Sequence, residues 1–454
     1  MKTMTYKKKY VSTTNACKLC RPLGAMLAFR GIEGAVPFLH GSQGCATYMR
    51  RYIISHFNEP IDIASSSLGE KNAVYGGGAN LKLGLTNVIN KFQPSLVGIA
   101  TTCLTETIGD DVAMFLNQFK NETSESALPH LVHVSTPSYS GTHMEGLHDA
   151  VRAVVDFLAA PGPATASVNL LPGFISPADT RYLQEVLHDF GLAATILPDI
   201  SDTLDGPALR RYEMIPAGGT PITAIKGMGA AQATIEFGRT VADRLSPGLL
   251  LNERFNIPRT RLGLPMGLRE TDRFFSALTA ISGRPTPDRH AKERGRYIDG
   301  CVDGHKYLSG KRAVVYGEED LVVGLAAFLA EIGIKPVLCA SGGQSGKLAE
   351  AIAAVTGDIL TDQPLVREGL DFFEIAEEAE NLAPDLLIGH SKGYPLARKL
   401  AIPLIRVGFP IHDRLGGQRI LHLGYRGAQM LFDRIVNRLI EQKQDSTSIG
   451  YSYM

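Results

Sequence analysis

Three cysteines in the first quarter of the chain share a setting in which a thiol can bind an inorganic cofactor. Cys20 precedes RPLGAMLAF, Cys45 lies between GSQG and ATYMRRYIISHF, and Cys103 ends VGIATTC and precedes LTETIGDD. We expect each thiol at or near the start of a helix, and Cys103 also at the carboxyl end of a strand. Free N–H groups and the positive end of the helix dipole stabilise negative charge there, which favours the thiolate that binds metal.

Two glycines precede Cys45, and their small size suggests a function. Gly41 and Gly44 precede the thiol, and glycine lets the backbone approach a bulky ligand closely. The separations within the trio, 25 and 58 residues, fit neither a zinc finger nor a ferredoxin run. Two interpretations stay open: three ligands of a larger cluster, or three small core residues.

The other cysteines carry less information. Cys17 and Cys20 form a C-x-x-C in ACKLC, but no strand precedes it, so thioredoxin-like chemistry is not expected. Cys17 is either a spare ligand or a bystander, while Cys301 and Cys339 stand alone. Six cysteines spread in this way over a long chain do not form a disulfide scaffold, and their clustering favours metal or redox chemistry.

Composition indicates a cytoplasmic globular protein. The 454 residues contain 46 Lys+Arg and 46 Asp+Glu, so the formal net charge is zero, and neither nucleic acid nor a membrane surface is expected as a partner. No apolar run of about 18 residues predicts a membrane span. The basic start, MKTMTYKKKY, lacks the apolar core of a signal peptide.

Short apolar runs alternate with helical patterns along the chain, which is typical of α/β folds with parallel sheets. The helical patterns include SPADTRYLQEVLHDFG and EEDLVVGLAAFLAEIG. We expect three Rossmann-like doubly wound domains over 1–160, 165–290 and 291–454, the last with a partner-contacting tail; AAPGPATAS is the first linker. The predicted strands are 95–100, 131–135, 167–171, 194–197, 313–317, 335–339, 385–390 and 403–408.

Long stretches of the sequence resemble the nitrogenase component 1 family, and its β-type subunits in particular. The resemblance is carried by CRPLGAMLAFRGIEGAVPFLHGSQGC, TTCLTETIGDD, STPSYSGTHMEG and PLIRVGFPIHDRLGGQRILHLGYRGA, and it covers nearly the whole chain. It implies three Rossmann-like domains and a homologous α-type partner in an α2β2 heterotetramer. It also implies an ATP-dependent homodimeric iron–sulfur protein as electron donor.

The resemblance assigns roles to particular residues. Three cysteines from each subunit hold an [8Fe-7S] cluster of the P-cluster type in this family, and Cys20, Cys45 and Cys103 occupy those positions. Ser138 matches a serine that joins the cluster on oxidation, with a plain loop serine as the alternative. Asp299 and Asp303 fall where some β-type subunits hold a structural cation, with solvated helix charges or N-cap partners as the alternative. The substrate-reducing cofactor belongs to the α-type partner, so no catalytic residue is expected here.

Three branches of the family stay open. The complete cysteine set favours an electron-relay subunit of a nitrogenase-like reductase, such as methylthio-alkane reductase, or of an enzyme of nitrogen fixation. FPIHDRLGGQR, where dinitrogen-reducing β subunits have a His-rich segment, and a short N-terminal region favour a cofactor-maturation scaffold holding a [4Fe-4S] cluster.

Two nucleotide motifs are excluded. SGGQSGKL departs from a phosphate loop at Ser341 and Leu348, so ATP must be handled by another protein. YGGGANLKLG has the wrong flanks for a nicotinamide dehydrogenase. His40, next to the second cysteine segment, is either a group that tunes the site through a hydrogen bond or a satisfied buried histidine.

Overall fold

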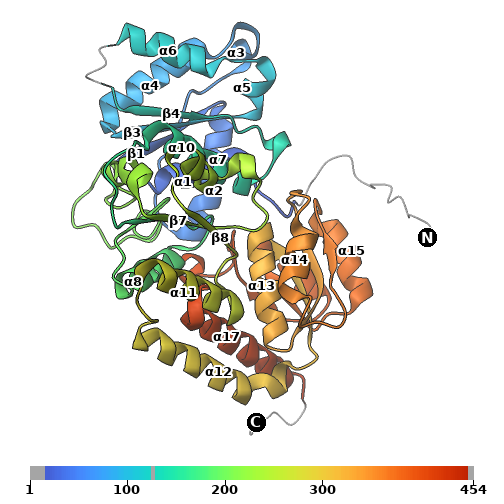
Figure 1. Ribbon diagram of the computed structural model, residues 1–454. Helices are drawn as coiled ribbons and strands as arrows, with labels where there is room; N and C mark the ends of the chain where they lie inside the picture. Colours follow the sequence, from blue (N-terminus) through green and yellow to red (C-terminus); the bar gives the residue numbers. More distant parts are fainter. Residues whose placement is uncertain (1–15, 124–127, 448–454) are drawn as a thin grey trace.

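The computed structural model describes residues 16–123 and 128–447, and within them the chain forms three parallel β-sheets with helices packed against them (Figure 1). The strand orders are β2-β1-β3-β4, β6-β5-β7-β8 and β11-β10-β9-β12-β13. Every strand pair is parallel. The predicted α/β fold class with parallel sheets is thereby confirmed.

The two central strands of the first sheet, β1 and β3, are buried on both faces, and nearly all their side chains are apolar. Side chains of alternate parity from β1 and β3 enter two separate cores, one with α1 and α7 and one with α4 and α6. The strands are β1 (Ala35–His40), β2 (Ala64–Ser65), β3 (Leu96–Thr101) and β4 (His130–Val134), and the helices are α1 (Arg21–Arg30), α2 (Gln43–Phe57), α3 (Glu70–Tyr75), α4 (Gly78–Phe92), α5 (Cys103–Ile108), α6 (Val112–Glu122) and α7 (His143–Leu158).

The second and third sheets share one continuous hydrophobic core. The second sheet contains β5 (Val168–Leu171), β6 (Ala194–Ile196), β7 (Ala233–Phe237) and β8 (Arg259–Leu262), with α8 (Pro177–Asp189), α9 (Ile222–Lys226), α10 (Pro247–Phe255) and α11 (Arg269–Ser282). The third contains β9 (Arg312–Gly317), β10 (Lys335–Ser341), β11 (Leu365–Arg367), β12 (Leu386–Gly389) and β13 (Leu404–Arg406), with α13 (Glu319–Glu331), α14 (Leu348–Thr356), α15 (Phe372–Leu382) and α16 (Tyr394–Lys399).

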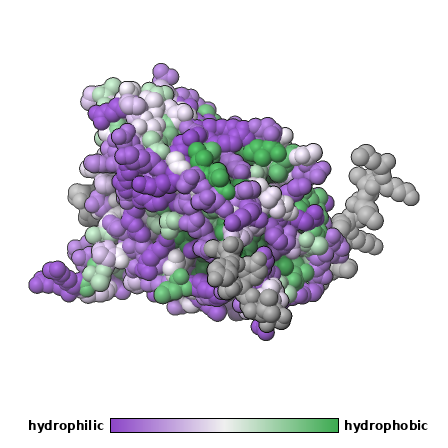
Figure 2. Space-filling model, turned by 90° about the horizontal axis from the view of Figure 1, so that it is seen from below, coloured by the Kyte–Doolittle hydropathy of each residue, from purple (hydrophilic) through white to green (hydrophobic). Residues whose placement is uncertain are grey.

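Two long helices pack against each other at the bottom of the molecule in Figure 1. They are α12 (Asp288–Leu308) and α17 (Gly424–Asp445). Seen from below, the surface is mostly hydrophilic and its hydrophobic residues lie in separate groups (Figure 2). Within the described chain, no helix combines the length and apolar character needed to cross a membrane.

All eight predicted strands are present, each within two residues of its predicted ends. The two quoted helical patterns are α8 and α13, and 159–167 connects α7 to β5. The domain boundaries stay a prediction; the second one, at 290/291, falls inside α12. The predicted partner-contacting tail, 441–454, begins within the last turns of α17, and residues 448–454, like the basic start of the chain, lie outside the described residues.

The close crossing of α1 and α7 positions the first cysteine segment. All ten residues of α1 are buried. A methyl group on Gly24 would overlap the carbonyl oxygen of His143, and one on Gly146 would overlap that of Arg21. The two helices therefore approach backbone to backbone, which only glycine permits at these two positions.

We expect Gly24→Ala to lower the free energy of unfolding by about 1–3 kcal/mol, because the added methyl must push α1 away from α7. Gly295→Ala is the matched control, since Gly295 lies in α12 with no atom near its would-be Cβ. That variant should be neutral or more stable by up to about 1 kcal/mol, as helix propensity dictates. Urea unfolding measures both, and equal effects would contradict the role given to the crossing.

Candidate functional site

Cys20 occupies the N-cap position of α1. Its backbone is extended, its carbonyl oxygen accepts the N–H of Leu23 at 3.1 Å, and its side chain is half-buried. The start of α7 fixes the residue before it: His143 N–H donates to the Leu19 carbonyl at 3.1 Å, and Leu19 N–H donates to His143 Nδ1 at 3.4 Å. The thiol is thus held at a helix start, as predicted.

Cys45 lies in the first turn of α2, directly after β1 and the turn through Gly41. The side chain is exposed, and Ser42 Oγ donates to Cys45 Sγ at 3.4 Å. A methyl group on Gly41 would overlap the side chain of Thr102. Gly41 therefore lets the Cys45 segment pack closely against the Cys103 segment. This contact adds to the role predicted for the glycines before Cys45.

Cys103 is the first residue of α5 and follows β3 directly. Thr102 caps this short helix, and its N–H donates to Thr105 Oγ1 at 3.0 Å. The backbone N–H of Ser138 donates to Cys103 Sγ at 3.2 Å. The thiol is therefore at the carboxyl end of a strand, as predicted, and already accepts a hydrogen bond of the kind that stabilises a thiolate.

The structure brings the three thiols together at one edge of the first sheet. β1 and β3 are neighbours in register, and their last pair is His40 with Thr101. The segments that follow them, which carry Cys45 and Cys103, thus leave the sheet side by side. The Cys20 segment joins them because Arg21 donates to Ser140, in the turn whose Ser138 N–H donates to Cys103 Sγ. The pKa of Cys20 is raised to about 11, mainly by burial and to a smaller extent by Cys45 and Cys103.

Ser138 belongs to a short 3-10 turn, Ser138–Ser140, that is fastened to the start of α1. The guanidinium of Arg21 donates to the hydroxyl of Ser140 and forms an ion pair with Asp149. Ser138 is half-buried, and its main chain touches Cys103. One arginine next to Cys20 in sequence therefore fixes the turn that contacts Cys103.

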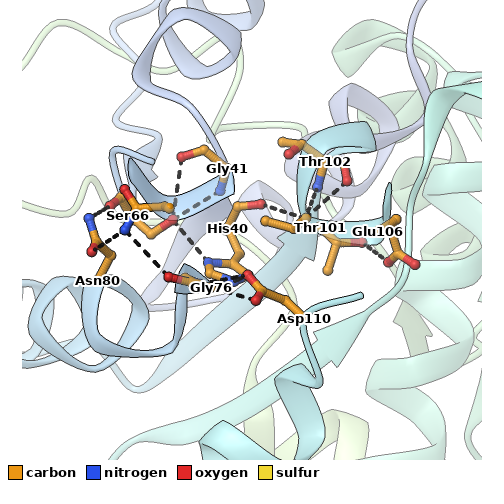
Figure 3. Close-up of polar contacts among 12 residues, drawn as sticks. His40, Gly41, Ser66, Gly76, Asn80, Thr101, Thr102, Glu106 and Asp110 are labelled. Atoms are coloured by element: carbon orange, nitrogen blue, oxygen red, sulfur yellow. Dashed lines mark hydrogen bonds and ion pairs between the residues drawn. The ribbon is translucent and has the colours of Figure 1, made fainter. Parts of the chain in front are cut away.

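His40 is a fully buried histidine with both ring nitrogens partnered, so the second of its two interpretations is confirmed. Nδ1 lies 2.9 Å from Ser66 Oγ and Nε2 lies 3.1 Å from Asp110 Oδ2 (Figure 3). Burial lowers its pKa, and Asp110 opposes the shift. Ser66 Oγ also accepts the N–H of Gly41 at 2.9 Å, so this network holds the turn that leads to Cys45.

The remaining candidates lie apart from the trio. Cys17 is buried in the core of the third sheet with Sγ 3.8 Å from His390 Nε2, and burial raises its pKa to about 12. Asp299 and Asp303 are exposed on α12. The bystander interpretation therefore suits Cys17, and the solvated interpretation suits the two aspartates.

The loop 341–347 has the strand–loop–helix layout of a phosphate loop, but carboxylates take its N–H groups. Ser345 N–H donates to Glu319 Oε1 at 3.1 Å. Gly346 and Leu348 donate to the two oxygens of Glu368, each at 3.0 Å. Anionic side chains thus occupy the donors that a phosphate would need, in agreement with the exclusion made from the sequence.

The thiol trio fits a multi-iron cluster better than a single metal ion. Among the described residues, no three or more His, Cys, Asp or Glu side chains are grouped closely enough to hold one ion. A larger group can span more widely placed thiolates, and iron–sulfur clusters take thiolate ligands. The exposed Cys45 leaves one side of the trio open, where ligands from another chain can complete a shared site.

Sequence reasoning missed the residues that support the trio. Arg21, Thr102 and His143 connect α1, α5 and α7 around the thiols. Arg21 and Thr102 stand directly beside Cys20 and Cys103 in the sequence. This adjacency is the one feature of the sequence that could have indicated their role. His143 lies 123 residues from Cys20, and its role depends on a helix crossing that only the structure shows.

Comparisons with known proteins agree over nearly the full length. The family model "Nitrogenase component 1 type Oxidoreductase" matches residues 20–440. The chain is 34% identical to the nitrogenase molybdenum-iron protein beta chain of Clostridium pasteurianum, over 94% of this chain and 93% of that one. It is 36% identical to the beta chain of Methanothermobacter thermautotrophicus, over 94% of each.

A solved structure, nitrogenase Cp1 at pH 6.5, contains a chain with a TM-score of 0.94 and 32% identity, covering 99% of this chain and 98% of that one. A chain from nitrogenase Cp1 at pH 5 shares the fold alone, with a TM-score of 0.72 and 15% identity.

The exposure of the thiols predicts their order of alkylation in the metal-free chain. At pH 8, iodoacetamide should modify Cys45 at least about tenfold faster than Cys20, because Cys20 is half-buried and its raised pKa leaves little thiolate. Cys17 and Cys339, both buried with pKa values of about 12, should stay protected. Peptide mass spectrometry measures the rates, and denaturant should equalise them. Rapid labelling of Cys20 would contradict the site geometry.

Proposed function

Because the chain belongs to the family of nitrogenase component 1 type oxidoreductases, as a β-type subunit, we propose that it is the electron-relay subunit of a two-component metalloreductase. In this proposal Cys20, Cys45 and Cys103 hold one half of an [8Fe-7S] cluster, and a homologous α-type subunit supplies the other half. The observation that carries the proposal is the placement of the three cysteine segments at one sheet edge, by the β1–β3 register and the contact of Arg21 with Ser140, with Cys45 exposed.

The residues around the thiols suit the binding of an anionic cluster. Cys45 and Cys103 lie in first turns of helices and Cys20 caps another, so backbone N–H groups and helix dipoles offset negative charge. Burial of Cys20 disfavours its free thiolate, and a bound metal removes this penalty by taking the place of the proton. When bound, such a cluster accepts and passes on single electrons.

Ser138 is the proposed fourth ligand of this chain. Its N–H donates to Cys103 Sγ at 3.2 Å, and it is half-buried in a turn that Arg21 ties down. Its hydroxyl therefore stays close to the thiol site. An alkoxide is a harder donor than a thiolate, so it suits iron in its more oxidised form.

The partners follow from the same proposal. An ATP-dependent homodimeric iron–sulfur protein would deliver electrons, because carboxylates of this chain already accept the N–H groups of Ser345, Gly346 and Leu348 at the phosphate-loop-like segment. The α-type partner of an α2β2 assembly would hold the substrate-reducing cofactor. The complex would reduce either methylthio-alkanes or dinitrogen, and the names of the relatives above point to the second.

One observation favours a second candidate function, the cofactor-maturation scaffold with an interfacial [4Fe-4S] cluster. In FPIHDRLGGQR, Leu415 and Gly416 stand where dinitrogen-reducing subunits carry histidines. Leu415 is 84% exposed and Gly416 has a φ of 82°. His412 is therefore the one histidine of this segment.

Iron content separates the two functions. We expect eight irons per αβ interface in the complex purified with a partner that lacks its catalytic cofactor, whereas the scaffold would hold four. Cys45→Ser should remove most of this iron, because thiolate is the preferred ligand of iron–sulfur clusters. Cys301→Ser, which changes a half-buried thiol on α12, is the matched control and should retain it. Iron analysis and electron paramagnetic resonance provide the readout, and full iron content in Cys45→Ser would overturn the proposal.

Ser138→Ala tests the serine separately. If the Ser138 hydroxyl loses its proton when the site is oxidised, the potential of that couple falls by about 59 mV per pH unit for one electron and one proton. The variant should lose this pH dependence while keeping the iron content, because the backbone N–H to Cys103 remains. Redox titration at several pH values measures the slope, and an unchanged slope would show that Ser138 is a plain loop residue.

A further inference from the structure

The segment 135–140, which leads from β4 towards α7, contains four serine and threonine residues. The hydroxyls of Ser135, Thr136 and Ser140 each donate a hydrogen bond within the chain. Ser138 differs, because its hydroxyl has no hydrogen-bond partner among the described residues, although its N–H is bonded. The segment is therefore held in place by its other hydroxyls, and the Ser138 hydroxyl is left free to bind a ligand.

The carboxylate of Glu106 fixes the first half of this segment. Glu106 is half-buried in α5, three residues after Cys103. Its Oε1 accepts Ser135 Oγ at 2.6 Å and also the hydroxyl of Thr101 (Figure 3). Thr101 is the last residue of β3 and Ser135 directly follows β4. One oxygen atom thus joins α5 to the ends of two neighbouring strands.

Thr101 extends the effect of Glu106 to the next residue. A threonine hydroxyl has one proton to donate and two lone pairs that accept. Because the Thr101 hydroxyl gives its proton to Glu106, its lone pairs are available, and Thr136 N–H donates to one of them at 2.9 Å. The Thr136 hydroxyl donates in turn to the Thr101 carbonyl at 2.8 Å. Glu106 therefore holds Ser135 directly and Thr136 through Thr101.

Pro137 transmits this position to Ser138. It is the one residue between Thr136 and Ser138, and its ring restricts φ, which is −66° here. The place of Thr136 therefore limits where Ser138 can lie. Ser138 N–H reaches Cys103 Sγ at 3.2 Å, so the serine stays beside the thiol that precedes Glu106 by one helical turn.

We propose that Glu106 is a positioning residue for Ser138. It holds residues 135 and 136 so that the free hydroxyl of Ser138 stays beside Cys103. A carboxylate suits this role, because hydrogen bonds to a charged acceptor are stronger than those between neutral groups. The proposal rests on the ligand role given to Ser138 above, and it adds a residue that acts through other side chains.

Hydrogen exchange of the metal-free chain tests the positioning itself. Glu106→Ala removes the oxygen that accepts both hydroxyls, so the amides of Thr136 and Ser138 should exchange at least about tenfold faster. Glu106→Gln keeps an amide oxygen that accepts the same hydroxyls, so it should retain slow exchange. Mass spectrometry of the peptides measures the rates, with α7 as the internal reference. Unchanged exchange in Glu106→Ala would overturn the proposal.

Electron paramagnetic resonance of the oxidised αβ complex tests the effect on the cluster site. Glu106→Ala and Ser138→Ala should keep their iron and change the spectrum in the same way, whereas Glu106→Gln should have the unaltered spectrum. If Ser138→Ala changes the spectrum and Glu106→Ala does not, the positioning role is wrong and the ligand role stands. If Ser138→Ala leaves the spectrum unchanged, the ligand role fails, and the positioning role fails with it.

Glu350→Ala is the matched control. It removes the same charge from the first turn of a helix, since Glu350 is exposed in the first turn of α14 against the third sheet. This variant should leave both the exchange of the 135–140 amides and the spectrum unchanged. Circular dichroism establishes that each variant is folded. Equal effects of Glu350→Ala and Glu106→Ala would show a general loss of stability and contradict the role given to Glu106.

Discussion

The pairing of β1 with β3 is the constraint on which the thiol site depends. In a parallel pair, neighbouring strands end at the same sheet edge, so the residues that follow them start from neighbouring points. The register that matches His40 with Thr101 therefore puts Cys45 and Cys103 on adjacent segments. A slip of one residue in this pairing would turn each side chain of β1 to the opposite face of the sheet. The residues that now pack in one hydrophobic core would then face the other.

A second layer of contacts turns this coarse placement into a site. The His40 carbonyl accepts both Thr102 N–H and Thr105 Oγ1, each at 3.1 Å, so the end of β1 is bonded to the start of α5. The buried ring of His40 holds the other side of the same turn through Ser66 and Asp110 (Figure 3). Low dielectric surroundings strengthen such bonds, so a fully partnered polar network of this kind makes the turn rigid.

The sequence predicted those parts of the fold and site that local pattern determines. Strands such as 95–100 are apolar on both faces and stand between helical patterns, so they were recognisable. By contrast, five strands went unrecognised: β1, β2, β7, β8 and β11. β2 and β11 are only two and three residues long, β1 contains Pro37, and β8 is RTRL, whose arginines pair with acidic residues such as Glu236. Tertiary contacts decided those elements, and propensity alone could not.

The same division holds for the thiol site. The trio itself was predictable because each cysteine stands at a strand end or helix start that the pattern shows. The tie between Arg21 and Ser140, or between His143 and Leu19, joins residues more than 100 positions apart. Such pairings depend on the crossing of α1 and α7, which rests on two glycines whose separate positions in the sequence reveal nothing about each other.

His143 links the thiol site to an interior cavity that Glu318 lines. Its Nδ1 accepts the N–H of Leu19, the residue before Cys20, so the proton of the neutral ring resides on Nε2 and is donated to Glu318. One imidazole thus fixes both the approach to α1 and the orientation of a cavity carboxylate. Both ring nitrogens of His143 are engaged, one with Leu19 and one with Glu318. A substitution at Glu318 would therefore change the position of the imidazole that holds Leu19. The thiol site and the cavity lined by Glu318 therefore share a structural support.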